Sequence, residues 1–308
     1  MLMTKYFQIH LNDRYNNHMN RYLDSTGSSK FLSEHAKELD ELMQNSDGAL
    51  YDGTDLVEFI DDEAKEYTVR EGTRRILDLA FLGKKKLEKI TLPNTLEVIG
   101  CRAFKSCGIR EINMPDSIRA IKDEAFMNCK LLKKLEIHEG VLVWGTTVLA
   151  GCDELEIVSL PNDMYHIPDW TFYCNYKLKK VKFPSNLLSI GNYAFGACFA
   201  LEGIELPERV SSLGIAAFAN CRNIKQIVFP SGLKKIDGRC FQSCESLSEI
   251  VIPKQISFIG VQAFDACPDL KVYIKKFGLK LKAGKHFATA LTSSTQYYSN
   301  GIINNVNR

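Results

Sequence analysis

Apolar and polar residues follow one another along this chain in a pattern that repeats about every 23 residues, a period typical of repeat solenoids. Phenylalanine occupies one position of the pattern in every copy except one, which has Leu149 there. The number of residues between successive copies is constant except for one interval that is slightly shorter. The phenylalanines are Phe81, Phe104, Phe126, Phe172, Phe195, Phe218, Phe241 and Phe264. This regularity predicts a fold built from equal, repeated units.

Each copy predicts two extended segments and one turn-rich segment. Leu201 to Leu206 alternates apolar with polar residues in its second half, which indicates a strand with one buried face, and Pro207 ends it because proline lacks an N–H donor. Residues 210–213 predict a second short strand that turns at Gly214, and the apolar spacing of residues 217–221 predicts one helical turn. One copy has too few inward positions to bury its apolar face alone, so the copies must stack.

The predicted fold class is therefore an α/β repeat solenoid of about nine coils of about 23 residues, each with short strands and a helical turn. In such a stack the phenylalanines form one continuous buried column. The predicted divisions are an N-terminal flank with one amphipathic helix over Lys30–Asn45 (1–46), a hairpin cap turning at Asp52-Gly53 (47–63), nine repeats (64–269) and a β-rich C-terminal cap or tail (270–308).

The repeats read L-x-x-I-x-L-P-x-x-L-x-x-I-G-x-x-A-F-x-x-C-x-x, without the asparagine of the common leucine-rich-repeat consensus. The unit resembles the BspA-like subclass of leucine-rich repeats, from Asp47 to Ile274. The resemblance implies a right-handed leucine-rich-repeat superhelix and a role in protein interaction or adhesion, since many members are surface proteins of bacteria and of protozoan parasites. It names no ligand.

Two copies depart from the pattern and are expected to alter the local curvature. The fourth copy has His138 for proline, Trp144 for isoleucine and Leu149 for phenylalanine. The fifth has Pro168 for glycine, Thr171 for alanine, and Asn175 in the cysteine position, with Cys174 displaced by one place.

Composition and motifs narrow the classes of function. A chain of 308 residues with 45% apolar residues is typical of a globular protein, and its longest apolar stretches are too short to span a membrane. The balance of 39 bases and 37 acids excludes a uniformly basic nucleic-acid binder. No nucleophile elbow, zinc-protease motif, phosphate-binding loop or dinucleotide fingerprint occurs, and the histidines share no ligand spacing. We expect no enzyme, cofactor or metal.

Seven of the ten cysteines occupy one repeat position, and Cys240 takes the place of a buried alanine. They predict a ladder of reduced structural thiols. Reduced thiols and the absence of a leader pattern at the N-terminus predict a cytoplasmic protein. The alternative is a surface or secreted protein exported by a route that this sequence does not show.

Aromatic residues at solvent-facing repeat positions suggest a partner hot spot. Trp170, Tyr173, Tyr176 and Phe199 are predicted to form an exposed patch, with Tyr165 and His166 nearby. The alternative is that these rings only cover the local irregularity. On the strand face, Lys179, Lys180 and Lys182 could belong to a pair of basic stripes that bind an acidic surface, or they could simply be solvated.

Charge is unevenly distributed between the ends of the chain. Residues 31–71 hold 13 acids and 3 bases, whereas residues 270–308 hold 7 bases and no acid. Opposite charges could favour weak, salt-sensitive head-to-tail contact between copies, unless the two ends are independently solvated. The function predicted from the sequence is a non-enzymatic protein–protein interaction module. The alternatives are a BspA-type surface adhesin and a self-associating scaffold.

Overall fold

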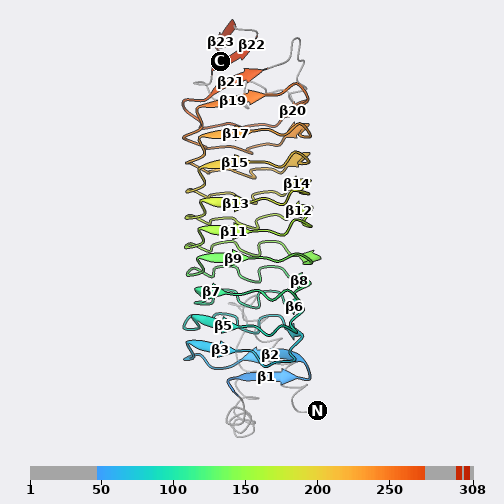
Figure 1. Ribbon diagram of the computed structural model, residues 1–308. Coiled ribbons are helices and arrows are strands. Elements are labelled where there is room, and N and C mark those ends of the chain that lie inside the picture. Colours follow the sequence, from blue (N-terminus) through green and yellow to red (C-terminus); the bar gives the residue numbers. More distant parts are fainter. Residues whose placement is uncertain (1–46, 275–295, 300–301, 306–308) are drawn as a thin grey trace, which may run out of the picture. The chain divides into compact units, whose positions relative to one another are not determined.

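The computed structural model describes residues 47–274, 296–299 and 302–305, and these residues form strands and turns without any helix (Figure 1). The chain divides into two compact units, residues 1–49 and 50–308. The fold described below is that of the second unit, a β-solenoid of about ten coils rather than the nine predicted. The predicted helix over Lys30–Asn45 lies outside the described residues.

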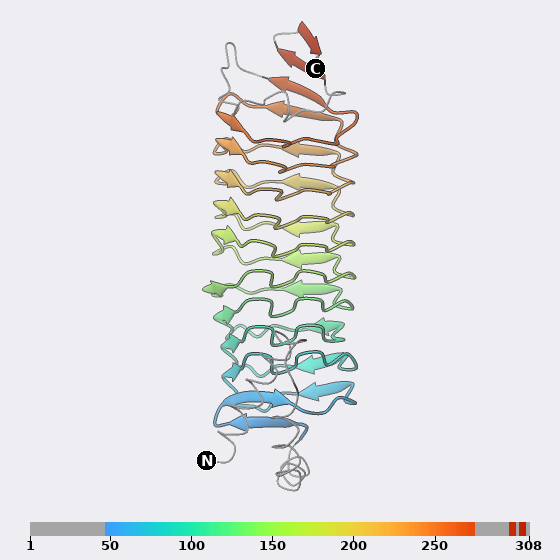
Figure 2. The ribbon, with the colours of Figure 1, turned by 180° about the vertical axis from the view of Figure 1, so that it is seen from behind.

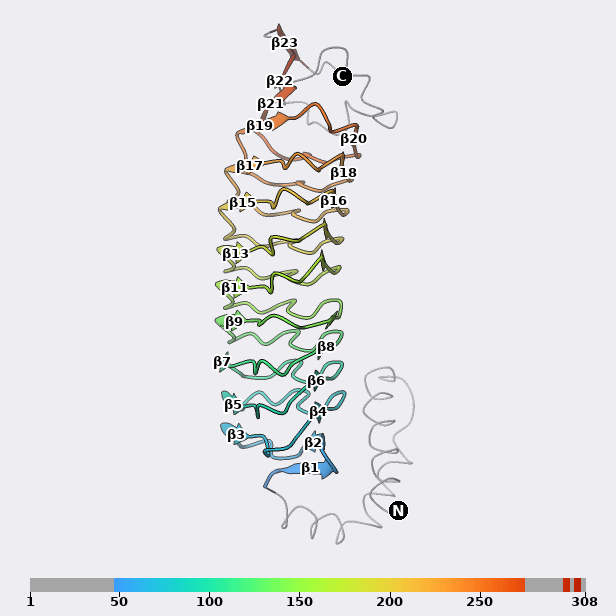
Figure 3. The ribbon, with the colours of Figure 1, turned by 45° about the vertical axis from the view of Figure 1, so that its right-hand side comes forward.

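Each full coil contributes one odd-numbered and one even-numbered strand, and the two sets lie on opposite sides of the stack (Figures 1 and 2). The same separation is visible in the turned view of Figure 3. The odd-numbered strands are β3 (Glu66–Thr68), β5 (Lys89–Thr91), β7 (Glu111–Ile112), β9 (Lys134–Glu136), β11 (Ile157–Ser159), β13 (Lys180–Lys182), β15 (Gly203–Glu205), β17 (Gln226–Val228), β19 (Glu249–Ile252) and β21 (Lys271–Ile274). The even-numbered strands are β4 (Arg75–Ile76), β6 (Val98–Ile99), β8 (Ala120–Ile121), β10 (Val143–Trp144), β12 (His166–Ile167), β14 (Ser189–Ile190), β16 (Ser212–Leu213), β18 (Lys235–Ile236) and β20 (Phe258–Ile259).

Parallel pairing keeps the repeats in register. In β11, Ile157 pairs with Lys134 of the coil before and with Lys180 of the coil after, and all three hold the same repeat position. The single shorter step falls between β5 and β7, where Lys89 pairs with Glu111 and the register is kept. Because each pair joins the same position of two repeats, like side chains meet from coil to coil.

Hairpins close the described ends of the second unit. β1 (Ala49–Asp52) and β2 (Asp55–Phe59) run in opposite directions around Gly53 and Thr54 (Figure 1). β2 then pairs in parallel with β4. Beyond β21, β22 (Gln296–Ser299) continues the parallel sheet and pairs in antiparallel fashion with β23 (Ile302–Asn305).

The predicted phenylalanine column is confirmed. Neighbouring rings from Phe172 to Phe264 stack at centroid distances of 5.0 to 5.6 Å, and every ring is fully buried. A second run extends from Phe59 to Phe126 at 4.9 to 5.2 Å. Leu149, also fully buried, separates the two runs. The column places one large apolar side chain at the centre of each coil.

The predicted helical turn is wrong for the described residues, and so is the α/β class. The Phe104 N–H donates to Ala125 O of the next coil at 2.8 Å, while the Cys107 N–H donates back to Phe104 O at 3.1 Å. Arg102 and Ser106 have positive φ values of 56° and 60°, which an α-helix does not allow. Similar positive φ values recur in the other coils. The segment is therefore a ladder of turns in which alternate N–H groups bond between coils.

The cysteine position completes this ladder. Cys129 Sγ donates to Phe104 O of the preceding coil at 3.0 Å, and Cys221 Sγ donates to Phe195 O at 3.1 Å. All ten cysteines are free thiols. Burial raises the pKa of Cys129 and Cys221 to about 12, so these side chains stay protonated and act as small buried donors.

We expect a thiol-reactive dye to label at most two of the ten cysteines in the folded protein. Cys101 and Cys174 are partly accessible, whereas the other eight are buried and the thiolate is the reactive form. Counting the labelled thiols by mass spectrometry, with and without denaturant, checks this. Denatured protein kept without reductant should yield all ten labels, and a smaller number there would contradict the free-thiol ladder.

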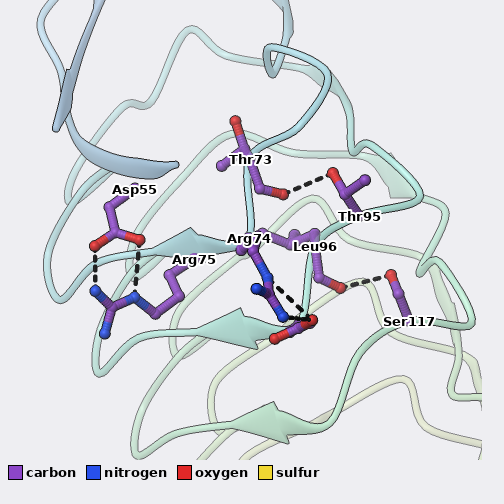
Figure 4. Close-up of polar contacts among 8 residues, drawn as sticks. Asp55, Thr73, Arg74, Arg75, Thr95, Leu96 and Ser117 are labelled. Atoms are coloured by element: carbon purple, nitrogen blue, oxygen red, sulfur yellow. Dashed lines mark hydrogen bonds and ion pairs between the residues drawn. The ribbon is translucent and has the colours of Figure 1, made fainter. Parts of the chain in front are cut away.

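Exposed side chains also bond from coil to coil. Asp55 and Arg75 form a two-point ion pair between β2 and β4, and Thr95 Oγ1 donates to Thr73 O at 2.9 Å (Figure 4). Exposed ion pairs of this kind contribute at most about 1 kcal/mol each. The coils are therefore held mainly by backbone bonds and by the buried columns.

Candidate partner-binding surface

The even-numbered strands are interrupted at the fifth coil. β10 ends one sheet, and β12 begins the next. In regular coils the glycine that follows the strand donates its N–H across the stack, as Gly191 does to Ile167 O at 2.8 Å. Pro168 stands at this position after β12 and has no N–H to donate. The departure seen in the sequence therefore removes one bond between the fourth and fifth coils.

The buried columns are altered in the same coils. Asn175, fully buried, holds the cysteine position, and its Oδ1 accepts the Cys152 N–H at 2.8 Å. The Asn175 Nδ2 group has no hydrogen-bond partner among the described residues. A buried amide without a partner costs about 1 to 3 kcal/mol. Asn175 therefore supplies an acceptor to the buried Cys152 N–H, at the cost of an Nδ2 group without a described partner.

Three aromatic rings gather where the fifth and sixth coils meet. Trp170 stacks on Tyr193 at 4.2 Å with an interplanar angle of 9°, and Tyr173 meets the Trp170 ring edge-on at 4.7 Å. Trp170 has a φ of 61°, and its N–H donates to Asn192 O at 2.9 Å. Trp170 is 36% exposed, and the other two rings are half-buried. The stack leaves part of an indole ring accessible on a well-bonded turn.

A second group of rings lies a few residues further along the same coils. Tyr176, 41% exposed, stacks on Phe199 at 4.9 Å, and the Arg222 guanidinium lies 4.8 Å from the Phe199 centroid. A hydrogen bond with the Cys174 thiol is the main cause that raises the pKa of Tyr176. Burial, followed by the same thiol, raises the pKa of Tyr173. The Cys174 thiol therefore lies near both tyrosine side chains.

These residues are named here the aromatic cluster: Trp170, Tyr173, Tyr176, Tyr193, Phe199 and Arg222. The structure joins the four aromatic residues that the sequence suggested in two ring pairs, Trp170 with Tyr173 and Tyr176 with Phe199. Sequence reasoning missed Tyr193 and Arg222. Both could have been found from the period, because each holds the repeat position of a cluster member in the preceding coil, Trp170 and Phe199 respectively.

Tyr165 and His166 make contacts other than those of the aromatic cluster. Both are exposed at β12, and His166 Nδ1 lies 2.7 Å from Ser189 Oγ in β14. Within the described part of the chain, no ring contact joins Tyr165 to Trp170 or Tyr173. They belong to the strand surface rather than to the turns.

The three predicted lysines lie on the odd-numbered side of the stack. Lys179 forms an ion pair with Glu156 at 3.2 Å, so its charge is partly compensated. Lys180 and Lys182 are exposed on β13, and neither makes an ion pair with a described residue. Their partners on β11 are the uncharged residues Ile157 and Ser159.

Metal and membrane features are lacking in the part of the chain that the structure describes. No group of three histidine, cysteine, aspartate or glutamate side chains gathers closely enough there to hold a metal ion. In the same residues, no helix has the length and apolar character needed to cross a membrane.

The repeats match the profile of the BspA-type leucine-rich repeat region over residues 58–178 and 166–280, which together make up more than half of the chain. The chain belongs to the BspA-type leucine-rich repeat family. A search of curated proteins finds no significant match to this chain.

Solved structures of leucine-rich repeat proteins resemble this BspA-type chain. A leucine-rich cell surface protein of Faecalibacterium prausnitzii matches with a TM-score of 0.54 and 22% identity, over 77% of this chain and 78% of that one. A leucine-rich repeat protein of Bacteroides ovatus matches with a TM-score of 0.52 and 20% identity, over 80% of this chain and 88% of that one. At these identities the likeness concerns the fold.

Proposed function

We propose that this BspA-type protein is a non-enzymatic interaction module that binds another protein through its aromatic cluster. The observation that carries the proposal is the accessible Trp170 ring, stacked on Tyr193 and held on a turn bonded to the next coil. Tryptophan, tyrosine and arginine are the residues most enriched at binding hot spots, and the cluster combines all three types.

Rigidity supports the same proposal. Binding costs free energy when side chains must be ordered, and a preformed surface reduces that cost. Trp170 is restrained by its Tyr193 stack and Tyr173 contact, while Phe199 is held between Tyr176 and Arg222. A partner would meet rings that are already in place.

The proposed setting is the cell surface. The Faecalibacterium prausnitzii protein of similar fold is described as a leucine-rich cell surface protein, which supports this choice over the cytoplasm expected from the thiols. Biotinylation of intact cells with a reagent that does not cross membranes checks it. Labelling only after lysis would favour the cytoplasmic alternative.

The cluster is tested by the quadruple variant Trp170→Ser, Tyr173→Ser, Tyr176→Ser and Phe199→Ser. We expect its affinity for the partner captured from native cells to fall at least about tenfold, because hot-spot residues contribute most of the binding free energy. Surface plasmon resonance with the purified partner gives the value.

The matched control is Ile157→Ser with Val228→Ser, which removes apolar residues that are 48% and 69% exposed on odd-numbered strands. Its affinity should equal that of the native protein. Equal binding by the quadruple variant and the control would eliminate the aromatic cluster as the binding surface.

A further inference from the structure

A second apolar surface lies at the beginnings of the even-numbered strands β10, β12 and β14. Leu142 is 79% exposed, Val143 and Tyr165 are each 53% exposed, and Leu188 is 38% exposed. Leu142, Tyr165 and Leu188 hold the same repeat position in three successive coils. These four residues are named here the apolar row. Large apolar side chains grouped in this way mark interaction sites more often than scattered ones do.

The backbone holds the apolar row in place. The Leu142 N–H donates to Arg119 O at 2.8 Å, and the Leu188 N–H donates to Tyr165 O at 2.8 Å. The Ser211 N–H of the next coil donates to Leu188 O at 2.9 Å. β12 and β14 pair in parallel, and paired strands are spaced by about 4.8 Å, so Tyr165 and Leu188 follow one another at a similar step along the stack. β10 and β12 are not paired, so Leu142 and Val143 lie on the other side of the break between the two sheets.

Basic residues flank the apolar row at both ends. Arg119 precedes it by one coil, and Lys234 follows it by two coils at the same repeat position. The Arg119 guanidinium donates to Asp116 O and Ile118 O, and both Arg119 and Lys234 are exposed.

The position of Arg119 and the position directly after it recur every 23 residues up to Lys234 and Lys235. Neither position holds an acidic residue in any of these coils. Lys235 is already paired with Asp237 at 3.1 Å, which leaves Arg119 and Lys234 as the flanking charges.

The nearest acids along the chain lie in the turns before the strands, where each accepts a backbone N–H. Asp163 Oδ2 accepts the Gly140 N–H at 2.8 Å, and Glu139 Oε1 accepts the Asn162 N–H at 3.0 Å. His166, beside Tyr165, contacts Ser189 and carries no negative charge. The row therefore lies between Arg119 and Lys234, with the carboxylates of Glu139 and Asp163 held in the preceding turns.

We propose that the apolar row binds an acidic amphipathic helix of a partner protein, lying across the even-numbered strands. Neighbouring side chains on one helix face, at i and i+3 or i+4, are about 5 to 6 Å apart, close to the step of about 4.8 Å between the paired strands β12 and β14. Apolar residues of such a helix would meet Leu142, Tyr165 and Leu188. Its carboxylates would approach Arg119 and Lys234 at the two ends.

This inference is independent of the proposed function, because it uses residues at the beginnings of the even-numbered strands and another kind of contact. The aromatic cluster lies in the turns, and the apolar row lies at β10, β12 and β14. Either surface can therefore be removed by substitution without changing the other.

The test uses synthetic helical peptides and the full-length protein. One peptide of about 18 residues carries leucine at i, i+3, i+4 and i+7 positions with glutamate elsewhere, a second replaces the glutamates with lysine, and a third is a scrambled form of the first. Fluorescence anisotropy should show that the acidic helix binds at least about tenfold more tightly than the other two.

Variants then locate the binding site. Leu142→Ser with Tyr165→Ser and Leu188→Ser should weaken binding of the acidic helix at least about tenfold, and Arg119→Glu with Lys234→Glu should weaken it and reduce its salt dependence. The control Ile157→Ser with Val228→Ser, on the odd-numbered strands, should bind like the native protein, and so should the aromatic-cluster variant.

Three results would overturn the inference. The first is equal binding of the acidic and basic helices, and the second is no binding of the acidic helix. The third is a native protein that dimerises in light scattering while the apolar-row variant is monomeric, because a second copy would then be the occupant.

Discussion

Replacing Phe195 by alanine is expected to lower the free energy of unfolding by about 3 to 5 kcal/mol. The ring is fully buried between Phe172 and Phe218, with centroid distances of 5.0 and 5.2 Å, and the Phe183 ring meets it edge-on at 5.6 Å. The Phe195 N–H donates to Ala217 O at 2.8 Å, so the coil cannot easily collapse onto the cavity. Denaturant unfolding followed by circular dichroism measures the change.

Phe199→Ala is the matched control in the same coil. This ring is half-buried and contacts Tyr176 and Arg222 at the surface, so its loss should cost less than about 1.5 kcal/mol. Similar values for the two variants would mean that the column does not carry the stability assigned to it.

The second large effect is expected for Gly214→Ala, which should lower the free energy of unfolding by about 1 to 3 kcal/mol. A β-carbon there would lie 2.7 Å from Asn192 N and 2.7 Å from Gly191 C of the preceding coil. The Gly214 N–H donates to Ile190 O at 2.8 Å, which ties the two backbones together at this point. The coils must then move apart, and thermal and urea unfolding both report that cost.

Gly203→Ala, in the same coil, gives the comparison. A β-carbon at Gly203 meets no atom within 4 Å, so the change should stay within about 0.5 kcal/mol. A loss at Gly203 as large as that at Gly214 would show that glycine flexibility, rather than close approach of the coils, determines the effect.

The irregular coils concentrate several features that reduce local stability. Leu149 interrupts the phenylalanine column, Pro168 removes a bond between coils, and Asn175 buries an amide group without a partner among the described residues. In a solenoid such costs stay local, because each coil contacts only its neighbours. The aromatic cluster and the apolar row both lie in or next to these coils, so both proposed binding surfaces fall in this part of the stack.

Part of the fold could be predicted from the sequence, as individual residues show. The column through Phe195 was predictable because one large residue at a constant period must meet its copies in neighbouring coils. The helical turn was wrong because residues 217–221 have helical apolar spacing, yet the Phe218 N–H bonds to Cys240 O of the next coil. Nothing within a single repeat indicates that its alternate N–H groups have partners outside it.

The surfaces were only partly predictable for a related reason. Trp170 and Tyr173 stood out because their types are unusual at solvent-facing repeat positions. Tyr193 was missed because its importance comes from stacking on Trp170 at 4.2 Å, a contact between coils. Leu142 and Leu188 look like ordinary apolar residues in the sequence, and only their exposure distinguishes them.

The period by itself determined that this protein is a stack of equal coils, with phenylalanine, glycine and cysteine in columns, because equal coils bring equal positions together. Only the tertiary structure decided the path of the turns, the break before β12 and the side chains that remain accessible. The hydrogen bonds of the turns and the exposure of each side chain depend on the neighbouring coil. That coil lies about 23 residues away along the sequence, so its contacts form only when the coils stack.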